Sequence, residues 1–272
     1  MIVITGATGN IGRALAGRLH GHDPLAVVRR PADDLRSRYA IADFDRPQTI
    51  GDLLSPGDRL FLNSGIWPGF VAAHRAVIDL AAKAGVAQIV AVSVRGAAPG
   101  RRLGLGLHGL VDAHLKESGV PYAILRPSGF MQTLPRDFRD GTMYGAYGSA
   151  CVNYIDTRDI ADVAAALLTA PVGPGRVYEL TGPQSLSHDG IAAEIGKALG
   201  REARYVNLSV PEMAAHLERQ GIPQPFAGEL AALQAETGDG SWEATTTVVA
   251  ELTGHTPRSW QEFLTDHRHL FA

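Results

Sequence analysis

Three glycines near the start of the chain have a spacing suited to binding an anion. Gly6, Gly9 and Gly12 follow an apolar run at residues 1–5 and open a segment with helical periodicity at residues 11–20. We expect Gly6 to permit a tight turn, Gly9 to let the backbone approach a phosphate, and Gly12 to let the helix pack against the strand. The spacing is GxxGxxG rather than GxGxxG, but its place between a strand and a helix predicts a pyrophosphate-binding turn.

Two arginines stand at the end of the second apolar run, residues 24–29. Enzymes that prefer NAD place an acidic residue at this point to bind the adenosine ribose. Here the sequence reads VVRR, with Arg29 and Arg30, and a guanidinium group can pair with a phosphate through two hydrogen bonds. The pattern therefore predicts NADP(H) as the cofactor. An alternative is that Arg30 points to solvent. Asp33 and Asp34, which follow, are expected to form a solvated turn.

Strand-like and helical segments alternate through the first half of the chain. We expect strands at residues 1–5, 24–29, 39–44, 59–64, 88–94 and 121–127, and helices at about 11–20, 69–84 and 105–118. Continuous apolar strands separated by helices indicate a parallel sheet covered on both faces. With right-handed crossovers, this predicts an α/β fold with a Rossmann-type, doubly wound parallel sheet.

The alternation of strands and helices ends after residue 127, and the later pattern predicts how the chain divides into parts. Residues 1–130 are expected to form the NADP-binding core, to which residues 151–182 return as a short extended piece, a helix and a strand. Residues 131–150 are rich in glycine and are interpreted as a substrate-lining loop. Residues 183–272 are mostly helical and are expected to form a smaller substrate-binding lobe over the carboxyl edge of the sheet, where such folds bind ligands.

The composition excludes several classes of protein. The 272 residues carry a formal net charge of −3, and their Lys and Arg residues are scattered, which argues against a nucleic-acid partner. No uncharged apolar run is long enough to cross a membrane. The single cysteine, Cys151, suits a reducing compartment, and strand-like residues begin at Ile2, so we expect a cytoplasmic protein without a signal peptide. The sequence leaves the oligomeric state open.

These motifs resemble the atypical short-chain dehydrogenase/reductases of the NmrA-like group. The similarity is carried by TGATGNIG (5–12), VVRR (27–30), GVPYAILRPSGFMQ (119–132), YIDTRDIADVAAALL (154–168) and PRSWQEFL (257–264). That group includes NADPH-dependent quinone and dye reductases and redox-sensing regulators.

The resemblance implies a set of cofactor contacts. It places Gly6, Thr8, Gly9, Asn10 and Ile11 at the phosphates, Arg29 and Arg30 at the 2′-phosphate, Asp43 and Phe44 beside the adenine, Asn63, Ser64 and Gly65 towards the nicotinamide, and Pro127 and Ser128 near its ring. It implies a reductase with a small-molecule substrate as its partner.

The helix expected after the fifth strand lacks the Tyr-x-x-x-Lys pair with which most relatives in the wider superfamily protonate a carbonyl. It reads GLGLHGLVDAHLKESG and contains no tyrosine. His108 and Asp112 are four residues apart on one helical face and are candidates for a general acid, or for a structural surface pair. Ser93 falls where relatives place a hydroxyl that binds the substrate carbonyl, or is a plain strand-end serine. Tyr144, Tyr147 and Tyr154 are further candidate proton donors if the loop folds over the site, or they pack in the core.

A quinone, or a ketone hydrogen-bonded to its own hydroxyl, accepts hydride with little help from an acid. We therefore expect an NADPH-dependent reductase of a bulky planar aromatic carbonyl or quinone, as in a polyketide tailoring step. Five apolar residues could wall such a pocket, or pack in the core: Trp67, Phe70, Phe130, Met131 and Phe138.

Two other functions stay open. One is an NADP(H)-sensing binding protein without turnover, which the missing Tyr-Lys pair favours. The other is a sugar-nucleotide epimerase or dehydratase, which the same absence disfavours. No metal is expected, because His267 and His269 have no third ligand in the sequence pattern.

Overall fold

The computed structural model describes residues 1–32, 34–35 and 37–272, which divide into two compact units. Asp33, assigned above to a solvated turn, lies outside the described residues. Unit 1 comprises Met1–Pro127, Thr157–Leu180 and Val248–His255, and unit 2 comprises Ser128–Asp156, Thr181–Thr247 and Thr256–Ala272. Each unit is described by itself below.

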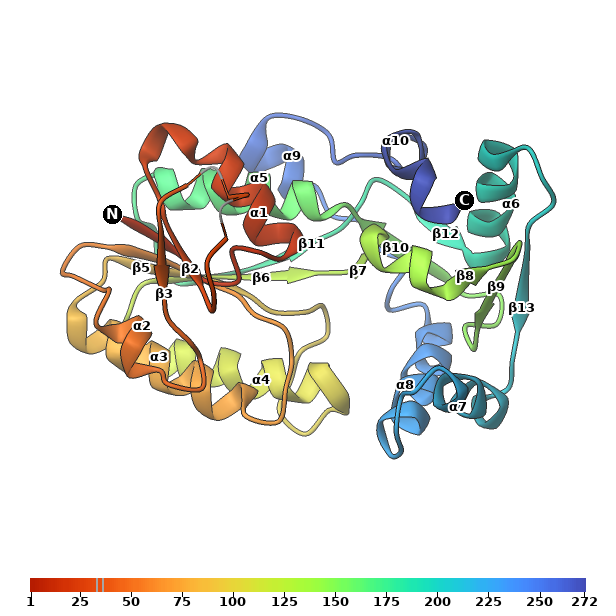
Figure 1. The fold of residues 1–272 in the computed structure, drawn as a ribbon, viewed down its shortest axis with the longest axis horizontal. Helices are drawn as coiled ribbons and strands as arrows, with labels where there is room; N and C mark the ends of the chain where they lie inside the picture. Colours follow the sequence, from red (N-terminus) through yellow and green to blue (C-terminus); the bar gives the residue numbers. More distant parts are fainter. Residues whose placement is uncertain (33, 36) are drawn as a thin grey trace. The chain divides into compact units, whose positions relative to one another are not determined.

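Unit 1 is built on a seven-stranded parallel sheet. Its strands are β1 (Ile2–Ile4), β2 (Leu25–Val28), β3 (Tyr39–Ile41), β4 (Arg59–Leu62), β5 (Gln88–Val92), β6 (Tyr122–Pro127) and β11 (Arg176–Leu180). They pair in the order β11-β6-β5-β4-β1-β2-β3 (Figure 1). The direction of winding reverses between β1 and β4, so the carboxyl ends of these two strands frame the crevice where doubly wound folds bind ligands. The predicted fold class is confirmed.

Helices cover both faces of this sheet, which explains why its strands are continuously apolar. They are α1 (Asn10–Arg18), α2 (Gln48–Gly51), α3 (Phe70–Ala84), α4 (Leu103–Glu117), α5 (Thr157–Thr169) and α9 (Val248–Thr253), with the short η1 (His20–His22) after α1. In Figure 1, α1, α5 and α9 lie on one face, and α2, α3 and α4 on the other. Residues of α9 therefore belong to the core unit, although the sequence assigned them to the C-terminal lobe.

Unit 2 contains two three-stranded sheets and most of the later helices. Its strands are β7 (Gly129–Phe130), β8 (Phe138–Arg139), β9 (Thr142–Gly145), β10 (Cys151–Ile155), β12 (Ser185–Ser187) and β13 (Arg204–Asn207). Its helices are η2 (Met131–Asp137), α6 (His188–Leu199), α7 (Val210–Arg219), α8 (Phe226–Glu236), η3 (Thr237–Asp239), α10 (Trp260–His267) and η4 (Arg268–Phe271). The segment 131–150, interpreted as a loop, holds η2, β8 and β9. Strands of two to four residues are too short for an alternating pattern to show.

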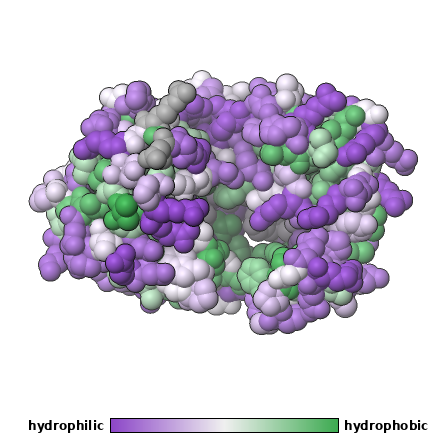
Figure 2. Space-filling model, in the orientation of Figure 1, coloured by the Kyte–Doolittle hydropathy of each residue, from purple (hydrophilic) through white to green (hydrophobic). Residues whose placement is uncertain are grey.

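The motif PRSWQEFL (257–264) contributes buried residues to the hydrophobic core of unit 2. Ser259 and Glu262 form a reciprocal capping box that starts α10, and this orients Trp260 and Phe263 inward, where both are fully buried. None of the helices in the described part of the chain combines the length and apolar character needed to span a membrane. On the face drawn in Figure 2, polar residues cover most of the surface.

Candidate functional site

The glycine turn after β1 has the geometry that the spacing predicts. Gly6 has φ +64°, in the left-handed region that glycine adopts most readily, and the N–H of Gly9 donates to its carbonyl at 3.0 Å. A Cβ on Gly12 would lie 2.2 Å from the same carbonyl oxygen, so α1 packs against the turn more closely than any other residue allows. A Cβ on Gly9 would meet its nearest atom at 3.4 Å, so the protein itself tolerates a side chain there.

The amino end of α1 is open to an anion. Gly9 is its N-cap and contributes no side-chain hydrogen bond, and the first turn carries no acidic residue. The first N–H groups of a helix have no partner within the helix and carry the positive end of its dipole. Thr8 and Asn10 are exposed beside them, whereas the side chain of Ile11 is buried, so Ile11 offers only its main chain. This is the arrangement that binds phosphates at helix N-termini.

Thr5 joins the ends of β1 and β4 at this point. Its buried hydroxyl accepts a hydrogen bond from the N–H of Asn63 at 2.9 Å and faces the carbonyls of Phe61 and Asn63, each at 3.0 Å. Asn63 is thereby held against the glycine turn, since a Cβ on Gly6 would lie 2.7 Å from its carbonyl oxygen. The sequence indicated Asn63 but not the threonine that fixes it.

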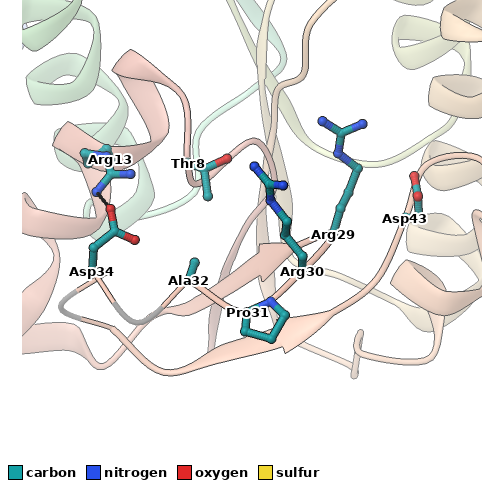
Figure 3. A pocket seen from close by; sticks show the side chains of 8 residues that line it. All are labelled: Thr8, Arg13, Arg29, Arg30, Pro31, Ala32, Asp34 and Asp43. Carbon is teal, nitrogen blue, oxygen red and sulfur yellow. Dashed lines mark hydrogen bonds and ion pairs between the residues drawn. The ribbon is translucent and has the colours of Figure 1, made fainter.

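A polar cavity of about 680 Å³ opens beside the glycine turn. The residues that line it are Thr8, Arg13, Arg29, Arg30, Pro31, Ala32, Asp34 and Asp43. Figure 3 shows that the side chains of Arg29 and Arg30 both extend from the end of β2 along this cavity. Arg29 and Arg30 both line this cavity, although both residues are exposed.

An ion pair closes one end of the cavity. Arg13 of α1 donates to the Oδ2 atom of Asp34 at 2.6 Å (Figure 3). This hydrogen bond is the main cause of the lowered pKa of Asp34. Asp34 lies in an exposed turn, as predicted, whereas Arg13 was not singled out. Their contact joins residues 21 positions apart in the chain, a pairing that spacing does not reveal.

His74 of α3 connects two segments that carry predicted cofactor contacts. Its ring stacks on Phe44 at a centroid distance of 4.7 Å, and its Nδ1 lies 2.8 Å from the carbonyl oxygen of Phe70. That nitrogen must donate, so Nε2 is unprotonated; it lies 3.3 Å from the hydroxyl oxygen of Ser64, which donates its proton to the carbonyl of Gly65 at 2.8 Å. Burial lowers the pKa of His74 to about 4, so the ring is neutral near pH 7.

Ser93 and Asp112 form a buried network with Arg126. The Ser93 hydroxyl donates to Oδ2 of Asp112 at 3.0 Å, and Arg126 donates to the same oxygen from Nε at 3.0 Å and from a terminal nitrogen at 2.7 Å. Burial raises the pKa of Asp112, while Arg126 and Ser93 oppose the shift. The network ties β5, β6 and α4 together. A hydroxyl proton donated to Asp112 is not available to a substrate carbonyl.

The expected pair between His108 and Asp112 does not form. The carboxylate engages Arg126, a permanent cation on the neighbouring strand, which gives stronger hydrogen bonds than an imidazole on the same helix. His108 instead packs edge-on against Phe70 at 4.9 Å, and burial lowers its pKa to about 4. The protonated imidazole that the general-acid hypothesis requires is therefore not favoured near neutral pH.

The candidate aromatic walls divide into two groups. Phe70 is buried in the core of unit 1, and Met131 and Phe138 are buried in the core of unit 2, which agrees with the alternative that they pack. Trp67 and Phe130 are only half-buried. The indole N–H of Trp67 donates to a carboxylate oxygen of Asp45 at 3.1 Å.

The remaining candidates lie at the end of β6 and in unit 2. Pro127 is buried, and the Ser128 hydroxyl is buried without a hydrogen-bond partner among the described residues. The hydroxyl of Tyr154 lies 2.9 Å from Nε2 of His188, on which Tyr147 stacks at 3.8 Å. Burial raises the pKa of both tyrosines well above the ordinary value, so neither phenol is activated as an acid.

Comparison with known proteins decides the family. Residues 6–171 match the family model described as NAD(P)H-binding. The chain belongs to this NAD(P)H-binding family. The NAD(P)H azoreductase of Xenophilus azovorans is 30% identical over 100% of this chain and 99% of its own. Quinone oxidoreductase 2 of Escherichia coli is 29% identical, with the same shares covered.

A solved structure extends the comparison. The NADPH complex of the Escherichia coli quinone oxidoreductase covers 100% of both chains at 28% identity, with a TM-score of 0.85. The predicted NmrA-like relationship, the binding of an NAD(P)H cofactor and the class of NAD(P)H-dependent oxidoreductase are confirmed.

Proposed function

We propose that this chain is an NADPH-dependent reductase that transfers hydride to a quinone or carbonyl group of a bulky planar aromatic substrate. The observation that carries the proposal is the cavity beside the glycine turn, lined by Arg29, Arg30 and Thr8. Two guanidinium groups match the charge of a 2′-phosphate, which NADPH carries and NADH lacks. No acidic residue follows β2 directly to hold the free ribose diol of NADH.

The residues present fit this cofactor. The close approach of Gly12 to the turn and the open amino end of α1 suit a diphosphate. When bound, NADPH supplies the hydride.

The chain's own residues would hold the cofactor in four places. Gly6, Thr8, Gly9, Asn10 and Ile11 bind the phosphates, Arg29 and Arg30 the 2′-phosphate, Asp43 and Phe44 the adenine, and Asn63, Ser64, Gly65, Pro127 and Ser128 the nicotinamide side. Thr5 fixes the position of Asn63 by accepting its N–H, and His74 stacks on Phe44.

The state of Ser93 and His108 favours an acceptor that needs no acid. The Ser93 proton is donated to Asp112, and His108 is neutral near pH 7. A quinone suits such a site because, after it accepts hydride, its reduced oxygen can take a proton from water. We assign Ser93, His108 and Asp112 to the positioning of α4 and β5 rather than to proton transfer. The quinone and azo substrates named for the relatives are compatible with this chemistry.

The test is steady-state oxidation of NADPH with a panel of quinones and polycyclic ketones, with wild type and an Arg29→Ala, Arg30→Ala variant. Each lost charged contact costs roughly tenfold or more in affinity, so the double variant should bind NADPH at least about 100-fold more weakly and NADH nearly unchanged. Arg219→Ala, an exposed arginine of α7 outside the cavity, is the matched control. An equal loss for both coenzymes would remove the 2′-phosphate assignment.

A second candidate function is a sensor of the NADPH/NADP⁺ ratio that contacts another protein without turnover. The sequestered Ser93 and the neutral His108 favour it, because neither is free for acid chemistry. Tight NADPH binding with no oxidation by any acceptor in the panel would support the sensor and refute the reductase.

A further inference from the structure

We propose that Arg13 is a third ligand of the 2′-phosphate and that Asp34 competes with that phosphate for its guanidinium group. The inference rests on the proposed preference for NADPH and deepens it. It assigns a role to an ion pair that the cofactor contacts above leave unused, and it predicts that the carboxylate tunes affinity for phosphorylated coenzymes alone.

The position of Arg13 is the first step. It lies one residue beyond Gly12 in α1 and lines the same cavity as Arg29, Arg30 and Thr8 (Figure 3). The cavity therefore receives guanidinium groups from two elements, the end of β2 and the first turns of α1. A phosphate bound between them would be approached from both sides.

The state of its guanidinium group is the second step. Asp34 accepts a single hydrogen bond from Arg13, at 2.6 Å, so most of the five N–H donors of this group remain available. The two side chains are 47% and 66% exposed. Exposed ion pairs contribute little stability, so exchanging the carboxylate for a phosphate requires no buried contact to break.

The charge balance of the cavity is the third step. Its walls carry three arginines, Arg13, Arg29 and Arg30, and two aspartates, Asp34 and Asp43. A 2′-phosphate bears more negative charge than a carboxylate and offers three acceptor oxygens, so it is the stronger partner for Arg13. While Asp34 stays charged, it also repels that phosphate. Removing its charge should therefore tighten binding of the phosphorylated ligand.

The experiment uses calorimetric binding of 2′,5′-ADP, with 5′-AMP as the matched probe that lacks the 2′-phosphate. Arg13→Ala should weaken 2′,5′-ADP about tenfold and leave 5′-AMP within about twofold. Arg13→Lys, which keeps the charge but not the fork of donors, should fall between it and wild type. Asp34→Asn should tighten 2′,5′-ADP by about threefold to tenfold, and this gain should shrink in the Arg13→Ala background because the two residues act on each other.

Three results would overturn the inference. The first is an Arg13→Ala variant that binds 2′,5′-ADP like wild type, and the second is an equal loss for both probes. The third is an Asp34→Asn variant with unchanged or weaker binding of 2′,5′-ADP. If wild type prefers 2′,5′-ADP and only the change at Arg29 and Arg30 removes the preference, Arg13 has no such role but the proposed function stands. If wild type shows no preference, both fail.

Discussion

Replacing Gly12 by alanine tests the coenzyme turn most directly. The added Cβ would lie 2.2 Å from the carbonyl oxygen of Gly6, 2.7 Å from its carbonyl carbon and 2.8 Å from Cα of Ala7. All three are backbone atoms, so relief requires α1 and the turn to separate by roughly 1 Å. Alanine normally stabilises a helix interior by about 1 kcal/mol relative to glycine, but overpacking costs about 1–3 kcal/mol or more. Because all three clashes involve backbone atoms, we expect the upper end of this cost and a net loss of about 2 kcal/mol.

The binding effect should be larger than the stability effect. Separating α1 from the turn moves the helix N–H groups away from the diphosphate position, so NADP⁺ should bind more than about tenfold more weakly. Urea unfolding gives the free energy of unfolding, and calorimetry gives the dissociation constant.

Gly17→Ala is the control in the same helix. Gly17 is exposed and its Cβ would meet no atom within 4 Å, so only helix propensity changes. This variant should be up to about 1 kcal/mol more stable than wild type and bind NADP⁺ equally well. A Gly12→Ala variant that unfolds and binds NADP⁺ like wild type would refute the reasoning, since it would mean that the turn relaxes without cost.

The buried polar groups of unit 1 give three further predictions. Burial lowers the pKa of His74 and of His108 from 6.5 to about 4 in the folded chain. The neutral rings therefore contribute fully to the free energy of unfolding above pH 6.5. This contribution, up to about 3 kcal/mol for each residue, is lost as the pH falls towards 4. Thermal unfolding across this range should show a shallower pH dependence in His74→Phe or His108→Phe, and an unchanged slope would contradict the assignment. Asp112→Ala leaves the Arg126 cation without its main partner and should lower the free energy of unfolding by about 3 kcal/mol, measured by urea unfolding. A loss below about 1 kcal/mol would show that solvent replaces the carboxylate. Ser93→Ala should retain quinone reduction within about tenfold, because its proton is held by Asp112; a thousandfold fall in kcat would show that the hydroxyl acts on substrate.

The geometry of the glycine turn and the place of Arg29 and Arg30 after β2 could be predicted because their signals are local in the sequence. Gly6, with its left-handed backbone, and the tightly packed Gly12 are six positions apart, and Arg29 and Arg30 directly follow a strand. Each signal is a short motif attached to one strand end. The parallel sheet could also be predicted from the sequence, because a strand buried on both faces is an unbroken apolar run.

The contacts that tune the site could not be predicted, because they join residues far apart in the chain. His74 is reached by Ser64 from one loop and by Phe44 from another. Spacing alone suggested that Asp112 would face His108, yet it could not reveal that β6 places an arginine beside the same carboxylate. Helical spacing identifies which residues of one helix share a face, but the hydrogen-bond partner of Asp112 is set by a residue of the adjacent sheet.

The same choice of partners bears on the chemistry. Reduction of a simple ketone requires a proton as well as a hydride, and general acids contribute typically 10²–10⁴-fold to such steps. In the described part of unit 1, the two polar groups best placed by sequence for that task are the Ser93 hydroxyl, committed to Asp112, and the His108 ring, whose pKa is lowered by burial. Under the proposed function, we expect such a site to gain its rate from holding the two reactants in the correct geometry rather than from acid catalysis. It should therefore discriminate among acceptors by how well they tolerate hydride before protonation, and quinones should react far faster than simple ketones of the same shape.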